Sequence, residues 1–188
     1  MPRHTGSTDE AALPFFTIGH STLTIEAFAE ALGGARIGTL ADIRTVPRSR
    51  TNPQFNADRL PDSLSAYGIG YTLLPALGGL RAKSKTIPPE TDALWRNASF
   101  HNYADYALGE EFRAGLERLI ALGRERRTAM MCAEAVWWRC HRRIVADHLI
   151  AAGEAVFHIV GGRIEPARLT PGARVAGGRV TYPAPATA

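Results

Sequence analysis

Short apolar runs alternate with amphipathic segments along most of the chain. Apolar runs that stop at a glycine or a polar residue predict strands, and apolar residues spaced three or four positions apart predict helices. The predicted strands are residues 15–18, 37–43, 69–74, 128–132 and 155–160. The predicted helices are residues 24–32, 58–67, 100–107, 110–122 and 141–152.

Local signals mark the ends of several predicted helices. Thr24 has the side chain of a helix N-cap, and Gly33 and Gly34 are expected to end the helix that follows it. Gly123 is expected to end the helix that begins at residue 110, and Gly153 the one that begins at residue 141.

Strands separated by helices imply crossover connections and a largely parallel sheet. We therefore predict a single-domain α/β fold with a sheet of about five strands and helices on both faces. Residues 1–12 are expected to form a disordered leader, residues 13–165 the α/β domain, and residues 166–188 a tail rich in Pro, Gly and Ala. The tail either ends in a short strand at residues 179–182 or is disordered. The long loop 75–99 is expected to be a functional lid or a disordered segment.

Composition narrows the class of protein. The chain has 188 residues, of which 45% are hydrophobic and 21% charged, as in an ordinary globular domain. No apolar run approaches the roughly 20 residues that span a bilayer, and residues 1–10 lack the apolar core of a signal peptide. We therefore expect a cytoplasmic protein without a membrane partner.

The two cysteines are too few for the disulfide framework of a small secreted domain. Cys132 and Cys140 are therefore expected to be free thiols, a reactive pair or ligands. Two buried apolar cysteines are the structural alternative.

Positive charge in this chain is almost entirely arginine. The net charge is +4, and only Lys83 and Lys85 are lysines. Arginine suits bidentate contacts with phosphate or carboxylate, so the composition permits a phosphate-bearing small molecule or a nucleic acid as partner.

Polar and reactive residues follow the predicted strands at one edge of the sheet, where open α/β sheets bind their ligands. The candidates that follow the first, second and fourth strands are His20, Ser21, Asp42, Arg44, Arg48, Ser49, Arg50, Cys132, Glu134, Cys140, His141 and Arg142. We expect them to share one site.

The segment that begins at Cys132 has the strongest chemical signal. Cys140 is expected at a helix N-terminus, where free backbone N–H groups and the helix dipole favour anions and lower the pKa of a thiol. Cys140, or less favourably Cys132, would be a nucleophile or redox centre. Glu134 and His141 would transfer protons, and Arg142 would hold an oxyanion. In the structural alternative, Cys132 only ends a buried strand, Glu134 pairs with an arginine or caps a turn, and His141 caps the helix.

Two known classes of site also use cysteine, the tyrosine-phosphatase active site and the zinc site. A tyrosine-phosphatase cradle needs an arginine six positions after the cysteine, but Trp138 and Ala146 occupy those positions. Cysteine and histidine are also zinc ligands, yet the C-x7-C-H spacing has no second CxxC-like pair. We therefore assign no metal ligands here and keep zinc as an alternative; the sequence contains no other cofactor motif.

A second candidate region follows the second strand. Arg44, Arg48 and Arg50, with Asp42 and Ser49 among them, resemble an anion-docking strip in a proline-containing loop. The alternative is a solvated loop in which Asp42 pairs with Arg44. His20 and Ser21, after the first strand, would contact the substrate or only order their own turn.

Five motifs in order along the chain resemble those of the domain of unknown function 488 family. They are Thr17-Ile-Gly-His20-Ser21-Thr22, Asp42-x-Arg44-x-x-Pro47-x-Ser49-Arg50, Leu74-Pro-x-Leu-Gly-Gly79, Phe100-x-x-Tyr103-x-x-Tyr106 and Cys132-x-Glu134 with Cys140-His141-Arg142. The resemblance covers about residues 16–160. It implies an α/β fold and a shared polar site, and it supplies no reaction.

The leading hypothesis is an enzyme that acts on a phosphate-bearing or nucleic-acid-derived substrate through the Cys/Glu/His/Arg cluster. A nucleic-acid-binding module without catalysis is one alternative, because Trp137 or Trp138 could stack on a base while the other is buried. A thiol redox or metal-binding protein is the other alternative.

Overall fold

A six-stranded sheet forms the centre of the chain in the computed structural model, which describes residues 11–186. The strand order is β3-β2-β4-β1-β5-β6, and all neighbours are parallel except β5 and β6. The strands are β1 (Phe15–Gly19), β2 (Thr39–Asp42), β3 (Gly70–Leu73), β4 (Thr128–Cys132), β5 (Val156–Val160) and β6 (Arg163–Pro166). The predicted α/β fold is confirmed. The predicted leader lies largely outside the described residues.

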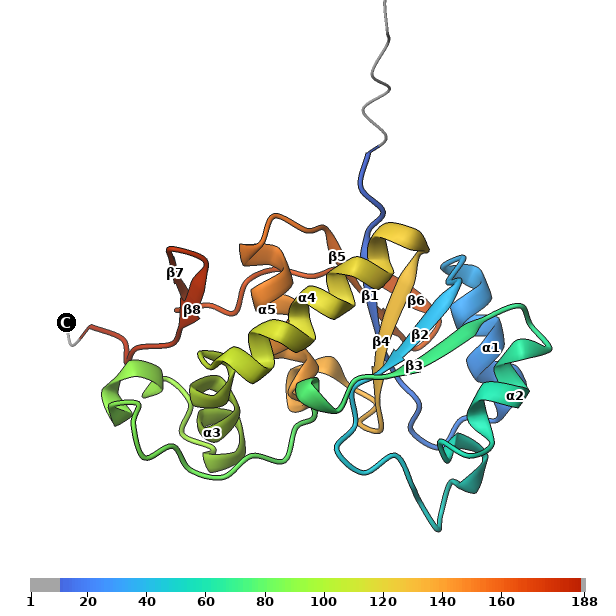
Figure 1. Cartoon of the computed structure of the whole chain (residues 1–188), viewed down its shortest axis with the longest axis horizontal. Coiled ribbons are helices and arrows are strands. Elements are labelled where there is room, and N and C mark those ends of the chain that lie inside the picture. Colours follow the sequence, from blue (N-terminus) through green and yellow to red (C-terminus); the bar gives the residue numbers. More distant parts are fainter. Residues whose placement is uncertain (1–10, 187–188) are drawn as a thin grey trace, which may run out of the picture.

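Five α-helices make the crossovers between the parallel strands. They are α1 (Ile25–Gly34), α2 (Leu60–Ser65), α3 (Ala98–Ala107), α4 (Glu110–Glu125) and α5 (Arg142–Ala151). α1 and α2 lie together on one side of the strands, and α3, α4 and α5 lie on the other (Figure 1). As predicted, the Thr24 side chain caps α1 by accepting a hydrogen bond from the backbone N–H of Ala27.

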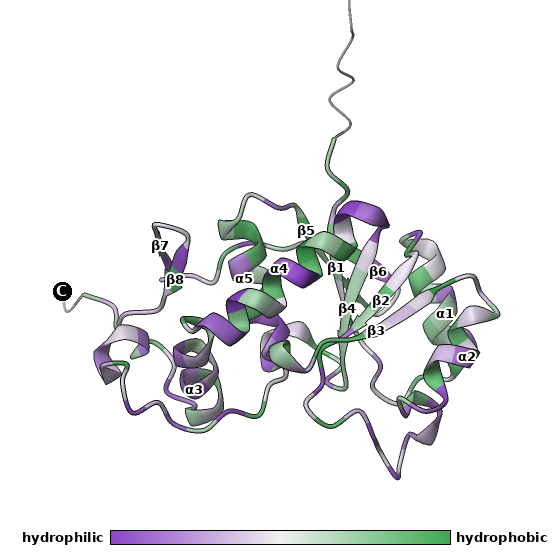
Figure 2. Ribbon diagram, viewed as in Figure 1, coloured by the Kyte–Doolittle hydropathy of each residue, from purple (hydrophilic) through white to green (hydrophobic). Residues whose placement is uncertain are grey.

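Each face of the sheet has its own hydrophobic core, because successive residues of a strand point to opposite faces. Phe15, Ala41 and Met130 pack with α3, α4 and α5, whereas Leu40 and Met131 pack with α1 and α2. Because the strands are buried on both faces, their sequences are nearly continuous apolar runs. The colouring of α4 alternates between hydrophobic and hydrophilic along its length, as expected for a helix that buries one side (Figure 2).

The carboxyl ends of the central strands meet at one place. Gly19 at the end of β1 pairs with Cys132 at the end of β4. Beyond the strands, the His20 N–H donates to the Cys132 carbonyl and the Ile43 N–H donates to the Met131 carbonyl. The crossovers from β1 and from β4 leave in opposite directions along the sheet, so the crevice between these two strands is the switch point where open α/β folds bind ligands.

The prediction that Gly123 ends its helix is wrong, because α4 continues through this residue to Glu125. A Cβ atom at Gly123 would lie 2.2 Å from the Phe15 ring. The glycine therefore allows α4 to approach β1 closely and does not serve as a stop.

β6 was missed as a strand. Gly161 and Gly162 both have positive φ, 55° and 76°, and they join β5 to β6 as a two-residue hairpin. A Gly-Gly pair directly after a predicted strand is a hairpin signal that the sequence did contain.

The C-terminal segment returns to the core. β7 (Arg174–Ala176) and β8 (Arg179–Thr181) form a separate hairpin, so the short strand expected at residues 179–182 is present. Val180 and Tyr182 are fully buried in the core beneath α3, α4 and α5. The loop 75–99 contains the short 3-10 turns η2 (Pro75–Leu77) and η3 (Pro89–Asp92).

No helix among residues 11–186 combines the length and the apolar character needed to cross a membrane.

Candidate functional site

Three potential ligand atoms converge where β4 ends and α5 begins. The sulfur atoms of Cys132 and Cys140 and a ring nitrogen of His141 all lie within 4.8 Å of one another. Cys132 is the last residue of β4, and Cys140 and His141 directly precede α5. The loop between them therefore returns the chain to the same strand end. We call these three residues the Cys–His cluster.

The His141 ring is held in one orientation. Its Nε2 lies 2.9 Å from the Ile43 carbonyl, and because a carbonyl only accepts, Nε2 carries the proton. Nδ1 is then the unprotonated nitrogen, and it lies 3.5 Å from the Cys140 sulfur. The ring packs against the edge of Tyr103, and a Cβ at Gly79 would lie 2.6 Å from Nδ1, so only glycine fits there.

Cys140 sits at the start of α5, as predicted, and its sulfur takes the place of a capping oxygen. The Arg142 backbone N–H donates to this sulfur at 3.5 Å, whereas the His141 side chain does not cap the helix. Burial raises the pKa of Cys140, but a hydrogen bond from Cys132 and the charge of Arg142 outweigh it, and the pKa is lowered to about 7. The same hydrogen bond and burial raise the pKa of Cys132. Burial lowers the pKa of His141, which keeps the ring neutral.

The Arg142 guanidinium is buried beside this cluster, with only 1% of the residue exposed. Its Nη2 donates to the Glu134 carbonyl at 2.8 Å. Within residues 11–186, Nε and Nη1 have no hydrogen-bond acceptor and the guanidinium has no carboxylate partner. Buried charges are normally paired, so this arginine retains the capacity to bind an anion.

A cavity of about 350 Å³ opens onto the cluster. Cys132, Cys140 and His141 line it together with Glu134, whose side chain is exposed. The other lining residues are Arg44, Thr45, Val46, Gly79, Leu80, Ser99, Phe100, Ala133 and Arg139.

Two further cavities differ from this one in their lining residues. A neighbouring cavity of about 370 Å³ shares Arg44, Val46 and Ala133 with it and adds His20, Ser21, Arg48 and Ser49. The other, about 740 Å³, lies between α1 and the β5–β6 turn, and among its lining residues only Ser21 and Glu30 have polar side chains. Because reactive groups gather in the first cavity, we place the candidate site there.

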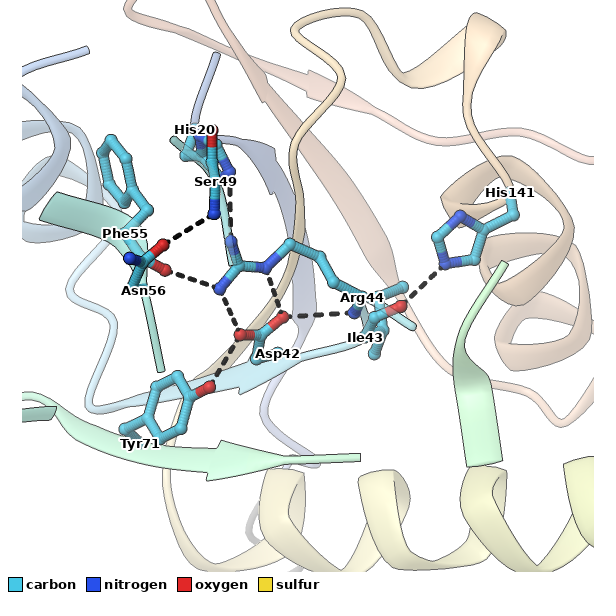
Figure 3. A network of polar contacts seen from close by, with 9 residues as sticks. All are labelled: His20, Asp42, Ile43, Arg44, Ser49, Phe55, Asn56, Tyr71 and His141. Carbon is cyan, nitrogen blue, oxygen red and sulfur yellow. Dashed lines mark hydrogen bonds and ion pairs between the residues drawn. The ribbon is translucent and has the colours of Figure 1, made fainter. Parts of the chain in front are cut away.

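Asp42 and Arg44 form a buried ion pair beside the site (Figure 3). We call this pair, together with the groups hydrogen-bonded to it, the brace. The Asp42 carboxylate accepts from Arg44 Nε at 2.9 Å and Nη2 at 2.6 Å, and from the Tyr71 hydroxyl at 2.7 Å. Arg44 also donates from Nη2 to the Phe55 carbonyl and from Nη1 to His20 Nε2. All three guanidinium nitrogens are thus bonded within the protein. Asp42 does pair with Arg44, as in the structural alternative, but the pair is buried and not solvated.

The brace reaches the cluster through the chain itself, since Ile43, between Asp42 and Arg44, supplies the carbonyl that holds His141 (Figure 3). His20 belongs to the brace as well. Its Nδ1 donates to the Ser21 carbonyl at 2.8 Å, and its ring stacks on Phe55. Burial lowers the pKa of His20.

The other residues of the predicted strip lie farther along the loop. Arg48 and Arg50 are exposed, and of the two only Arg48 lines the neighbouring cavity. The Ser49 N–H donates to Asn56 Oδ1, and the Ser49 hydroxyl accepts from the Asn52 N–H. Ser21 has a positive φ of 46°, a conformation that is uncommon outside glycine and that clusters at functional sites.

Sequence reasoning missed several supporting residues. Tyr71 donates to Asp42, and Asn56 accepts from the Ser49 N–H. Gly79 and Tyr103 pack on His141. The family motifs contained Gly79 and Tyr103, although no role was assigned to them. No local pattern marks Tyr71, which meets Asp42 only because β3 pairs with β2.

The adjacent rings of Trp137 and Trp138 contact each other edge to face, with centroids 5.5 Å apart, but they differ in exposure. Trp137 stacks on His158 with ring centroids 4.2 Å apart, whereas Trp138 is 46% exposed. Only Trp138 is therefore available to a partner.

Comparison with known proteins identifies one family. The family model described as "Domain of unknown function DUF488" matches residues 24–149, more than half of the chain. The matched segment includes the cluster and the brace residues Asp42 and Arg44, whereas His20 and Ser21 precede it. Neither a curated protein nor a solved structure matches the chain.

Proposed function

The chain belongs to the domain of unknown function DUF488 family, and from its site we propose that it is an enzyme acting on a phosphate-bearing or nucleic-acid-derived substrate. One observation carries the proposal: Cys132, Cys140 and His141 line one cavity, and their potential ligand atoms lie within 4.8 Å of one another. Clusters of this kind in a cavity are typical of reactive centres.

The anionic character of the substrate is supported by the charges around the cavity. Arg142 keeps two guanidinium nitrogens without an acceptor among the described residues, and it is the first residue of α5, at the positive end of the helix dipole. Arg48 lines the adjoining cavity and is exposed. A phosphate could therefore be held by Arg142 at the cluster or by Arg48 beside it.

The remaining residues take separate roles in the proposal. Glu134 lines the cavity and its side chain is exposed, so we assign it proton transfer. Asp42, Arg44 and His20 are positioning residues, because their polar atoms are occupied within the brace that holds the Ile43 carbonyl against His141.

The test is a turnover screen on nucleotides, phosphate esters and short nucleic acids with the variants Cys140→Ser and Glu134→Gln. Loss of a reactive or proton-transferring group is expected to lower turnover about 10²–10⁴-fold. Glu117→Gln, an exposed carboxylate on α4, is the matched control and should retain full turnover. Full turnover in both site variants contradicts the proposal. Salt-dependent nucleic-acid binding that is equal in all variants and is accompanied by no turnover favours a binding module instead.

A further inference from the structure

We infer that Cys132, Cys140 and His141 form a three-ligand binding site for Zn²⁺, with the fourth position of the metal open toward the cavity. Nothing in the family description assigns a metal to this chain. The inference rests on the donor set, its spacing, its orientation and the charge beside it.

The donor set suits zinc. Two cysteine sulfurs and one imidazole nitrogen are ligands of zinc, and three protein ligands with an open fourth position are typical of its catalytic sites. All three donors face the same cavity of about 350 Å³. Hard cations such as Mg²⁺ prefer oxygen ligands, which this cluster does not offer.

The spacing also suits zinc. With Zn–S near 2.3 Å and Zn–N near 2.0–2.1 Å, a tetrahedral ion separates a sulfur from a nitrogen by about 3.6 Å and two sulfurs by about 3.8 Å. Cys140 Sγ and His141 Nδ1 lie 3.5 Å apart, and all three donors lie within 4.8 Å of one another. Binding thus requires side-chain shifts of no more than about 1 Å.

His141 is already oriented as a ligand. A metal-bound histidine commonly donates its other ring N–H to a carbonyl or carboxylate, which fixes the tautomer. Here Nε2 donates to the Ile43 carbonyl, and Nδ1 is left unprotonated on the side of the two sulfurs. The Asp42–Arg44 brace on either side of Ile43 supports this carbonyl from behind.

The positive charge of Arg142 favours an anion as the fourth ligand of the metal. A zinc ion with two thiolates and one neutral histidine carries no net charge, whereas the adjacent guanidinium is buried without an acidic partner in the described chain. An anionic fourth ligand would balance that charge. Hydroxide or a substrate phosphate oxygen meets this need. The binding site does not depend on the proposed function; only a substrate oxygen as fourth ligand rests on it.

The experiment measures metal binding directly. The full chain, stripped of metal under reducing conditions, is given excess Zn²⁺ and passed through gel filtration. One zinc per chain is expected, with an X-ray absorption spectrum that shows two sulfurs near 2.3 Å and nitrogen or oxygen near 2.0–2.1 Å. Cys140→Ser and His141→Gln are each expected to weaken zinc binding by at least about 100-fold. His101→Gln, outside the cluster on α3, is the control and should bind zinc like the unmodified chain.

The experiment distinguishes a loss of zinc binding from a loss of folding and from a loss of activity. Circular dichroism of each metal-free variant establishes that it is folded, and the stoichiometry and spectrum of the unmodified chain test the site without any variant. Less than stoichiometric zinc, a ligand shell without sulfur, or equal binding by folded Cys140→Ser and His141→Gln overturns the inference. Stoichiometric zinc without turnover upholds the site and contradicts the enzyme proposal. Turnover by a chain that binds no zinc upholds the enzyme proposal and overturns the zinc site.

Discussion

Two buried arginines differ in what their surroundings leave them free to do. Arg44 pairs with Asp42, and its remaining donors reach His20 and a backbone carbonyl. Arg142 is also buried, but among residues 11–186 its guanidinium donates to the Glu134 carbonyl and has no carboxylate partner. A buried charge without a counter-charge destabilises a fold unless it is compensated. At the residue scale, the unmet charge of Arg142 is the feature that most directly indicates a ligand.

Asp92 carries a pH dependence that can be tested. Burial and the neighbouring Asp105 raise its pKa from 3.8 to about 6, although Asp92 accepts a hydrogen bond from the Tyr182 N–H. His101, 3.7 Å from Asp105, is the nearby basic group. The folded state therefore holds a proton that the unfolded state has lost, and stability falls as the pH rises from about 4 to about 6.

We expect Asp92→Asn to remove this loss, which is on the order of 1–3 kcal/mol. The asparagine oxygen can still accept from the Tyr182 N–H, and its amide can donate to Asp105. The measurement is urea unfolding at several pH values between 4 and 8. Asp62→Asn, an exposed carboxylate on α2, should keep the wild-type profile. Parallel profiles for Asp92→Asn and wild type would show that this carboxyl does not titrate abnormally.

At the scale of elements, the contact between α4 and β1 sets the geometry on one side of the sheet. Gly123 of α4 lies directly over Phe15 of β1, and no side chain fits between them. The helix thus tolerates a residue of poor helix propensity in order to pack closely.

Alanine at two helical glycines should have opposite effects on stability. Gly123→Ala is expected to destabilise the fold by about 1–3 kcal/mol, because its Cβ would overlap the Phe15 ring and force a shift. Gly33→Ala in α1 meets nothing within 4 Å and should stabilise the fold by up to about 1 kcal/mol. Chemical unfolding of both variants checks the pair, and a stabilising Gly123→Ala would disprove the close contact.

At the scale of the whole molecule, the C-terminal segment completes a core that begins near the N-terminus. Tyr182 is fully buried with Phe15 and α5 residues in one cluster, and its hydroxyl donates to Asp147 Oδ2 at 2.7 Å. The Thr170 N–H donates to the other oxygen of the same carboxylate. The segment after β6 is therefore held by both apolar and polar contacts.

Tyr182→Ala is expected to destabilise the protein by about 3–5 kcal/mol, because it empties a core position and removes the hydroxyl from Asp147. Tyr67→Ala is the matched control, since Tyr67 is 49% exposed and its loss should change stability by no more than about 0.5 kcal/mol. Unfolding in urea distinguishes the two. Equal stability of Tyr182→Ala and wild type would mean that the segment is dispensable.

Patterns within short stretches of the sequence were sufficient for the α/β class, for five strands and five helices, and for the N-cap at Thr24. These features depend on residues that are neighbours along the chain, whose periodicity and turn chemistry are local. Cys140 at the start of α5 is of the same kind. The sequence also predicted that the carboxyl ends of the strands lie at one edge of the sheet, because the strands were expected to be parallel.

Only the tertiary structure decided what those residues contact. Strand order placed Tyr71 against Asp42, a pairing that has no signal in the spacing of the sequence. The fold paired Arg44 with an acid and left Arg142 without one in the part of the chain that the structure describes, although both are arginines at the same sheet edge. Gly123 was expected to end a helix because glycine often does so, but in the structure it allows α4 to pack closely on Phe15. Hydrogen bonding and burial depend on residues far apart in the chain, so the sequence determined where the candidate site was expected, and the fold determined which of its groups keep unused hydrogen-bonding capacity.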